Sequence, residues 1–116
     1  MKKLFALILL FSVTFISAQE KEPLFEKSED LVKATYYYED GSVKEQGYFK
    51  DKKLEGRWVS YDKDGEKTMI AHYKAGKKVG KWFVWNDKML KEINFKNNVV
   101  VSIKNWNQDT RLASNK

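Results

Sequence analysis

Apolar and polar side chains alternate along much of the chain. The alternating segments are SVKEQGYFK (42–50), EKTMIAHYK (66–74) and KEINFK (91–96). In the second of these, Met69, Ala71 and Tyr73 fall on one side of an extended backbone and most polar residues fall on the other. A period of two is typical of β-strands with one buried side. We therefore predict an all-β protein, with any helix limited to the N-terminal segment and residues 23–33.

A short phrase also returns at a fixed interval. Gly-x-Trp stands at Gly56–Trp58 and again at Gly80–Trp82, 24 residues later, and Trp106 follows after another 24. Internal identity at such a period is typical of repeat proteins. The third copy has Lys104 in place of the glycine, as expected of a terminal capping unit. The recurring positions, to which we assign a structural role, are Gly41, Gly56, Trp58, Gly65, Gly80, Trp82 and Trp106.

Each copy contains the signals of a β-hairpin. Asp40–Gly41 and Asp64–Gly65 are favourable tight-turn pairs, because glycine adopts positive φ without steric cost. We expect about six or seven antiparallel strands between residues 33 and 103, since one hairpin alone buries too little surface. The predicted architecture is an antiparallel β-meander of about three 24-residue hairpin repeats, forming an elongated single-layer or curled sheet. The glycine before each tryptophan is expected to let the indole ring cover the backbone.

The N-terminus has the three parts of a secretory signal peptide. Two lysines precede the apolar run from Leu4 to Ile16, and small residues follow, so we place cleavage between Ala18 and Gln19. The alternative is a retained membrane anchor. No cysteine stands near the cut, which excludes a lipid anchor on cysteine. The predicted divisions are a signal peptide (1–18), a polar N-terminal linker (19–32), the β-repeat domain (33–106) and a polar C-terminal tail (107–116).

Composition narrows the class of protein further. Without residues 1–18 the chain has 20 basic and 16 acidic residues, a mild net charge of +4 with no dense basic block. Nucleic-acid binding is therefore not expected, although attraction to an anionic lipid surface stays open. The chain has no cysteine, so its stability depends on packing, and its 15% aromatic content is the obvious source.

The sequence offers little material for catalysis or metal binding. His72 is the single histidine and there is no cysteine, which leaves too few ligands for a zinc site. Asp62, Asp64 and Glu66 resemble part of a calcium loop but lack its ligand spacing, and a hairpin turn is the better interpretation. We expect a non-enzymatic protein with no catalytic residues, metal ion or cofactor.

Binding residues are sought among the aromatic side chains that differ between copies, because a partner is rarely periodic. Tyr36 and Tyr38 occupy the first copy where Ser60 and Asp62 stand one period later, and Trp85 replaces Tyr61. Arg57 and Lys81 flank the same strands and could form a charged rim. The candidate binding residues are therefore Tyr36, Tyr38, Trp85, Arg57 and Lys81.

The phrases YKAGKKVGKW (73–82) and FKDKKLEGRW (49–58), together with the Asp-Gly turn, resemble the variant class of MORN repeats (membrane occupation and recognition nexus). The resemblance covers roughly residues 36–106. Bacterial proteins built from this variant are often grouped with YwqK-type antitoxins. The resemblance implies an elongated antiparallel sheet that binds partners without catalysis. The antitoxin grouping implies a cytoplasmic inhibitor, whereas the predicted signal peptide implies export.

Together these features predict an exported β-repeat binding module that acts on a protein or cell-envelope partner, secreted or periplasmic. Two alternatives stay open. One is an inhibitor of the antitoxin or immunity type, and the other is a binder of anionic membrane surfaces. The identity of the partner and the oligomeric state are not encoded in any motif of the chain.

Overall fold

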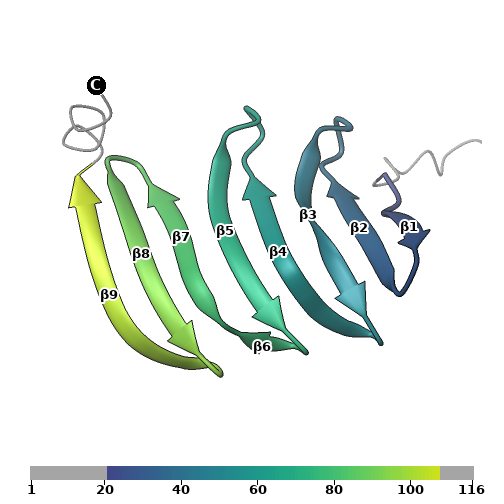
Figure 1. Ribbon diagram of the computed structural model, residues 1–116. Coiled ribbons are helices and arrows are strands. Elements are labelled where there is room, and N and C mark those ends of the chain that lie inside the picture. Colours follow the sequence, from purple (N-terminus) through teal and green to yellow (C-terminus); the bar gives the residue numbers. More distant parts are fainter. Residues whose placement is uncertain (1–20, 108–116) are drawn as a thin grey trace, which may run out of the picture.

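The computed structural model describes residues 21–107, which form one antiparallel sheet without helix (Figure 1). Neighbouring strands follow the order β1-β2-β3-β4-β5-β7-β8-β9, and the short β6 pairs with β5. The sheet is not closed into a barrel, and the prediction of an all-β meander is confirmed. The strands are β1 (Leu24–Ser28), β2 (Leu31–Tyr37), β3 (Val43–Lys50), β4 (Lys53–Tyr61), β5 (Lys67–Lys74), β6 (Lys77–Lys78), β7 (Gly80–Asn86), β8 (Met89–Lys96) and β9 (Val99–Asn107).

The predicted Asp-Gly turns are present. Gly41 and Gly65 have φ of 91° and 84°, and their N–H groups donate to Tyr38 O at 3.0 Å and Asp62 O at 3.1 Å. Both turns lie at the same edge of the sheet, the upper one in Figure 1. The opposite turns between β3 and β4 and between β8 and β9 use two non-glycine residues at positive φ, as a two-residue turn of type I′ requires.

The sheet begins earlier than predicted. Residues 24–28 form β1 and pair with β2, which starts at Leu31, so the predicted polar linker and the helix considered for residues 23–33 are wrong over this part. Glu29 turns the chain with a φ of 55°, and the ring of Phe25 packs edge-on against Tyr36 with centroids 6.2 Å apart. This aromatic contact and the pairing with β2 outweigh the polar composition of the segment.

Two of the predicted segments fall outside the described residues. The signal peptide, with its cleavage point between Ala18 and Gln19, precedes residue 21, and the C-terminal tail after Asn107 follows the last described position. Within residues 21–107, no helix is long and apolar enough to cross a membrane.

Most apolar packing lies on one side of the sheet, which we call the Trp face. Its buried residues are Ala34, Trp58, Ala71 and Trp82. Around them pack Tyr36, Phe49, Leu54, Met69, Tyr73, Ile93 and Phe95, all partly buried. Among the described residues no large side chain is fully buried, because a single layer of strands has no second layer to cover it.

Small residues beneath the indole rings make this packing possible. A Cβ atom at Gly47, on β3, would overlap the indole ring of Trp58. The Nε1–H of Trp58 donates to Tyr48 O at 3.0 Å, and that of Trp82 donates to His72 O at 3.1 Å, so the repeat preserves this hydrogen bond. Each ring is thus fixed over the strand that precedes it.

The glycines before the tryptophans have a different role from the predicted one. Gly56 and Gly80 have φ of 76° and 68°, and a Cβ atom at Gly56 would meet nothing within 4 Å. They are required by backbone conformation, where an L side chain is strained, and not by closeness of the ring. The residue that makes room for the ring is Gly47.

Trp106 departs from the series. It lies opposite Leu90 on the other side of the sheet, with Lys104 Nζ 4.0 Å from the centroid of its ring. The position equivalent to Trp82 in the last strand belongs to Ile103, since Trp82 pairs with Ile93 and Ile93 pairs with Ile103. Ile103 follows Trp82 after 21 residues, and Trp106 stands three positions further along the strand. Because successive side chains alternate between the two sides, this odd offset places Trp106 on the side opposite Ile103. The expectation that Trp106 continues the series in register is therefore wrong.

Candidate binding face

An unbroken chain of aromatic rings crosses the Trp face at right angles to the strands. Trp58 contacts Phe49 at a centroid distance of 5.4 Å and Tyr73 at 6.5 Å, and Tyr73 continues to Trp82 at 5.2 Å. Trp82 then reaches Phe95 at 5.0 Å. Edge-to-face and tilted contacts of this kind stabilise the rings beyond the area they bury. The surface is therefore both apolar and held in a fixed shape.

A second row of side chains runs beside the rings and differs in every copy. Its members, paired one with the next across the strands, are Tyr36, Glu45, Ser60, Met69, Val84, Lys91 and Asn105. We call it the variable row. Paired residues of an antiparallel sheet point to the same side, and Tyr36 and Met69 pack against the buried cluster, so this row lies on the Trp face. It carries an acidic residue near one end and a basic residue near the other.

Two hollows open along the variable row. One, of about 260 Å³, lies over Trp58 and is lined by Tyr36, Glu45, Ser60 and Met69 together with three apolar neighbours. The small side chain of Ser60, where the first copy has tyrosine, leaves this space. The second hollow, of about 360 Å³, is lined by Val84, Asn86, Met89, Lys91 and Asn105.

Charged groups reach the apolar surface at several points. Burial raises the pKa of the Tyr73 phenol, and the negative charge of Glu45 raises that pKa further. Lys78 Nζ lies 5.2 Å from the ring centroid of Trp82 and 5.4 Å from that of Phe95. A lysine in this position spreads its aliphatic stem over the rings and keeps its charge in water. The Trp face therefore combines an apolar surface with a few charged groups at defined positions.

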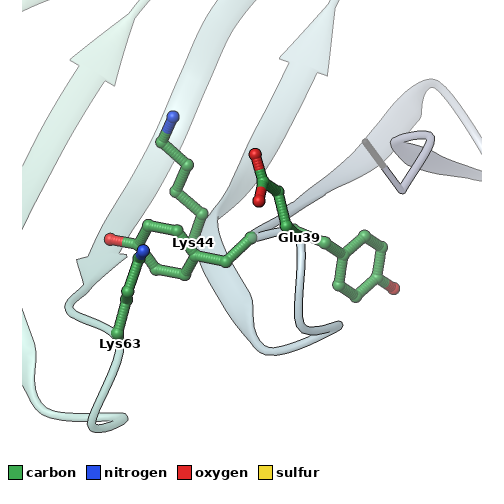
Figure 2. Close-up of a pocket in the computed structure, with 5 residues that line it drawn as sticks. Glu39, Lys44 and Lys63 are labelled. Atoms are coloured by element: carbon green, nitrogen blue, oxygen red, sulfur yellow. The ribbon is translucent and has the colours of Figure 1, made fainter. Parts of the chain in front are cut away.

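A separate hollow lies at the edge of the sheet that holds the Asp-Gly turns. Figure 2 shows Glu39, Lys44 and Lys63 around this space of about 240 Å³. Its centre is Tyr38, whose hydroxyl donates to Tyr61 O at 2.7 Å and whose ring centroid lies 5.9 Å from Lys44 Nζ and 5.8 Å from Lys63 Nζ. The hydrogen bond links neighbouring hairpins and gives Tyr38 a structural role.

The five predicted binding residues do not form one site. Tyr36 lines the hollow on the Trp face and Tyr38 lies at the turn edge. The other three belong to the opposite side, where Trp85 lies 6.2 Å from Phe83 between ring centroids and Arg57 and Lys81 are exposed.

Sequence reasoning missed most of the variable row. Glu45 and Lys91 are charged residues on an apolar side, and in the sequence Glu45 appears merely as a break in the alternation. A signal was present, since these positions differ between copies as the candidate aromatics do. Their alignment into one row follows from the strand register, which the sequence pattern leaves undetermined.

Within residues 21–107, no group of three or more histidine, cysteine or acidic side chains is placed to hold a metal ion. The carboxylate of Asp62 accepts the backbone N–H groups of Asp64 at 2.9 Å and Glu66 at 3.0 Å, which closes the hairpin turn. The Nδ1 atom of His72 forms a hydrogen bond with Lys81 O at 2.9 Å. Each of these polar groups therefore has a local structural partner.

Comparison with protein families identifies the repeat. Residues 32–51 and 54–75 match the family described as MORN repeat variant. The chain therefore contains two copies of this repeat, the first over β2 and β3 and the second over β4 and β5, each with the turn between its two strands. MORN repeats are generally non-catalytic and are associated with binding to proteins or membranes. A comparison with curated proteins found no significant match.

Proposed function

We propose that this protein is an exported, non-enzymatic binding module whose Trp face holds an extended segment of a protein partner in the cell envelope. The observation that carries the proposal is the open row of aromatic rings with the variable row beside it. Fixed aromatic rings provide apolar contact at low entropic cost. The neighbouring positions, which differ from copy to copy, supply the means to select one partner.

The two charges of the variable row define the chemistry of that segment. Glu45 on β3 and Lys91 on β8 are separated by four strand spacings, roughly 19 Å at about 4.8 Å each. An extended peptide of about six residues spans this distance. The fitting partner is therefore apolar in its centre, basic at the end near Glu45 and acidic at the end near Lys91.

Capture from envelope extracts tests this proposal. The purified protein is immobilised beside a Ser60→Arg variant, which fills the hollow over Trp58, and a Thr68→Arg variant, which lies beside Trp85 on the opposite side of the sheet. We expect Ser60→Arg to weaken retention of the captured protein more than tenfold, about 1.4 kcal/mol, while Thr68→Arg retains it. Circular dichroism and thermal unfolding of both variants control for folding. Equal retention by both folded variants would refute binding at the Trp face.

Export is part of the proposal and is supported by the N-terminal sequence, with its two lysines, apolar run and small residues before Gln19. Mass spectrometry of the native protein should find a chain that begins at or near Gln19. An intact Met1 on a cytoplasmic protein would overturn export. It would also favour the YwqK-type antitoxin alternative, for which the captured partner would be one toxin at a fixed ratio.

An anionic membrane surface is the second candidate, because Lys78 lies over the rings of Trp82 and Phe95 and the chain without residues 1–18 has a net charge of +4. Lysine beside aromatic rings suits the boundary between lipid headgroups and acyl chains. Sedimentation with vesicles of phosphatidylserine and phosphatidylcholine at about 0.05 and about 0.5 M salt distinguishes the candidates. Salt-sensitive binding that is lost in Lys78→Gln would favour the membrane, and absence of binding would favour a protein partner.

A further inference from the structure

The two outer strands of the sheet differ sharply. β1 has five residues and includes Glu26 and Lys27, whereas β9 has nine residues, Val99–Asn107, with Lys104 as the single charge. The exposed apolar side chains of β9 are Val99 (65%), Val100 (47%), Val101 (64%) and Ile103 (56%). Short, charged outer strands resist pairing with other chains, and long apolar ones promote it. β1 is therefore protected against further pairing and β9 is not.

The outer edge of β9 also lacks a backbone partner within the described part of the chain, where its pairing is with β8 alone. Half of the backbone groups of an outer strand point away from its neighbour, so a nine-residue strand offers about eight hydrogen-bonding groups to another strand. From these features we infer that β9 pairs antiparallel with β9 of a second copy of this protein, so that two sheets join into one. This inference is independent of the partner proposed for the Trp face.

Around a two-fold axis at Ile103, β9 is self-complementary from Ser102 to Lys104, before the irregularity at Val101 in its pairing with β8. Ile103 then meets its own copy, and Lys104 meets Ser102 of the other protomer, so no like charges face each other. Ile103 ends the apolar rows of the Trp face, since it pairs with Ile93, which pairs with Trp82. Its exposed side chain is then covered by the equivalent isoleucine. The apolar surface continues without interruption from one protomer to the next.

A second copy suits this edge better than an unrelated strand. A two-fold axis makes both partners equally long and equally apolar, which an isologous contact requires. The pairing also extends an architecture that the chain already uses at every strand, because each strand pairs antiparallel with the next.

Light scattering coupled to size-exclusion chromatography tests this inference. The purified protein should pass from monomer to dimer as its concentration rises to about 100 μM. Ile103→Lys places two ammonium groups opposite each other and should give a monomer, and Ile103→Glu should do the same. Mixing the two variants should restore a dimer, which loss of folding in either variant could not produce. Leu24→Lys on β1 is the matched control and should remain dimeric.

Cysteine cross-linking locates the contact. The chain has no cysteine, so an Ile103→Cys variant can form a disulfide with its own kind alone. Mild oxidation should cross-link Ile103→Cys at least tenfold faster than Leu24→Cys. A parent protein that stays monomeric over the whole concentration range would overturn the inference. A dimer that is lost in Leu24→Lys, or that cross-links equally well through Leu24→Cys, would overturn it too, because the contact would then lie elsewhere.

Discussion

Replacement of Gly47 by alanine tests the packing beneath the indole rings. The new Cβ atom would overlap the ring of Trp58, so the ring or β3 must move. Overpacking of this kind costs about 2 kcal/mol. A shifted ring also lengthens the 3.0 Å hydrogen bond from Trp58 Nε1 to Tyr48 O, worth about 1 kcal/mol. The lower flexibility of alanine in the unfolded chain returns about 0.7 kcal/mol. The expected net loss of unfolding free energy is about 2 kcal/mol.

Urea unfolding followed by tryptophan fluorescence measures this loss, which corresponds to a fall of about 10 °C in melting temperature for a domain of this size. A double-mutant cycle with Trp58→Leu isolates the cause. In the Trp58→Leu background, Gly47→Ala should cost less than about 0.5 kcal/mol, because the smaller side chain leaves room for the methyl group. A Gly47→Ala protein as stable as the parent, or an equal loss in both backgrounds, would refute the argument that Gly47 exists to accommodate the ring.

Further expectations concern the tryptophans, the left-handed glycines and acid stability. Trp82→Ala should cost on the order of 3–5 kcal/mol in urea unfolding, whereas Trp106→Ala, on the other side of the sheet, should cost under about 1.5 kcal/mol. Gly80→Ala should cost about 1 kcal/mol through the strain of its φ of 68° alone. The same loss of unfolding free energy should therefore be measured when Gly80→Ala is made in a Trp82→Ala background. A hydrogen bond from the N–H of Ala75, followed in importance by one from the side chain of Lys74, holds the pKa of Glu55 below its ordinary value of 4.5. Because the pKa of Glu55 is lower in the folded than in the unfolded protein, Glu55 stabilises the fold above pH 4.5 and loses this effect as the pH falls through the folded pKa. The difference in unfolding free energy between the parent protein and Glu55→Gln should therefore shrink on acidification. An NMR titration midpoint of Glu55 at or above 4.5 would contradict this.

Much of the fold could be predicted because its signals are local. Asp40–Gly41 and Asp64–Gly65 mark turns by backbone preference alone, and the alternation around Met69, Ala71 and Tyr73 identifies the side that packs. These features depend on residues close together in the chain. The meander order follows from them, since successive hairpins have little choice but to pair with their neighbours.

What could not be predicted depends on register between strands. Trp106 points to the other side because the last repeat is offset by three residues. The recurrence of tryptophan at a spacing of 24 residues conceals this offset in the sequence. Glu45 and Lys91 lie in one row because the pairing of each strand with the next brings these positions into line across the sheet. No single segment of the sequence contains both residues. The role of Gly47 required a contact with Trp58 on the next strand. For the same reason, the predicted binding residues were scattered over both sides and one edge.

The strict meander order has a mechanical consequence. The described chain enters through β1 at one border of the sheet and leaves through β9 at the other, so tension applied to its two ends acts first on the outermost strands (Figure 1). Each strand is held by bonds to adjacent strands, and these bonds are loaded one after another as a strand is peeled away. The protein should therefore lengthen in a series of hairpin-sized steps at low force. A module built this way can yield gradually under stretching while the repeats that remain paired keep their shape.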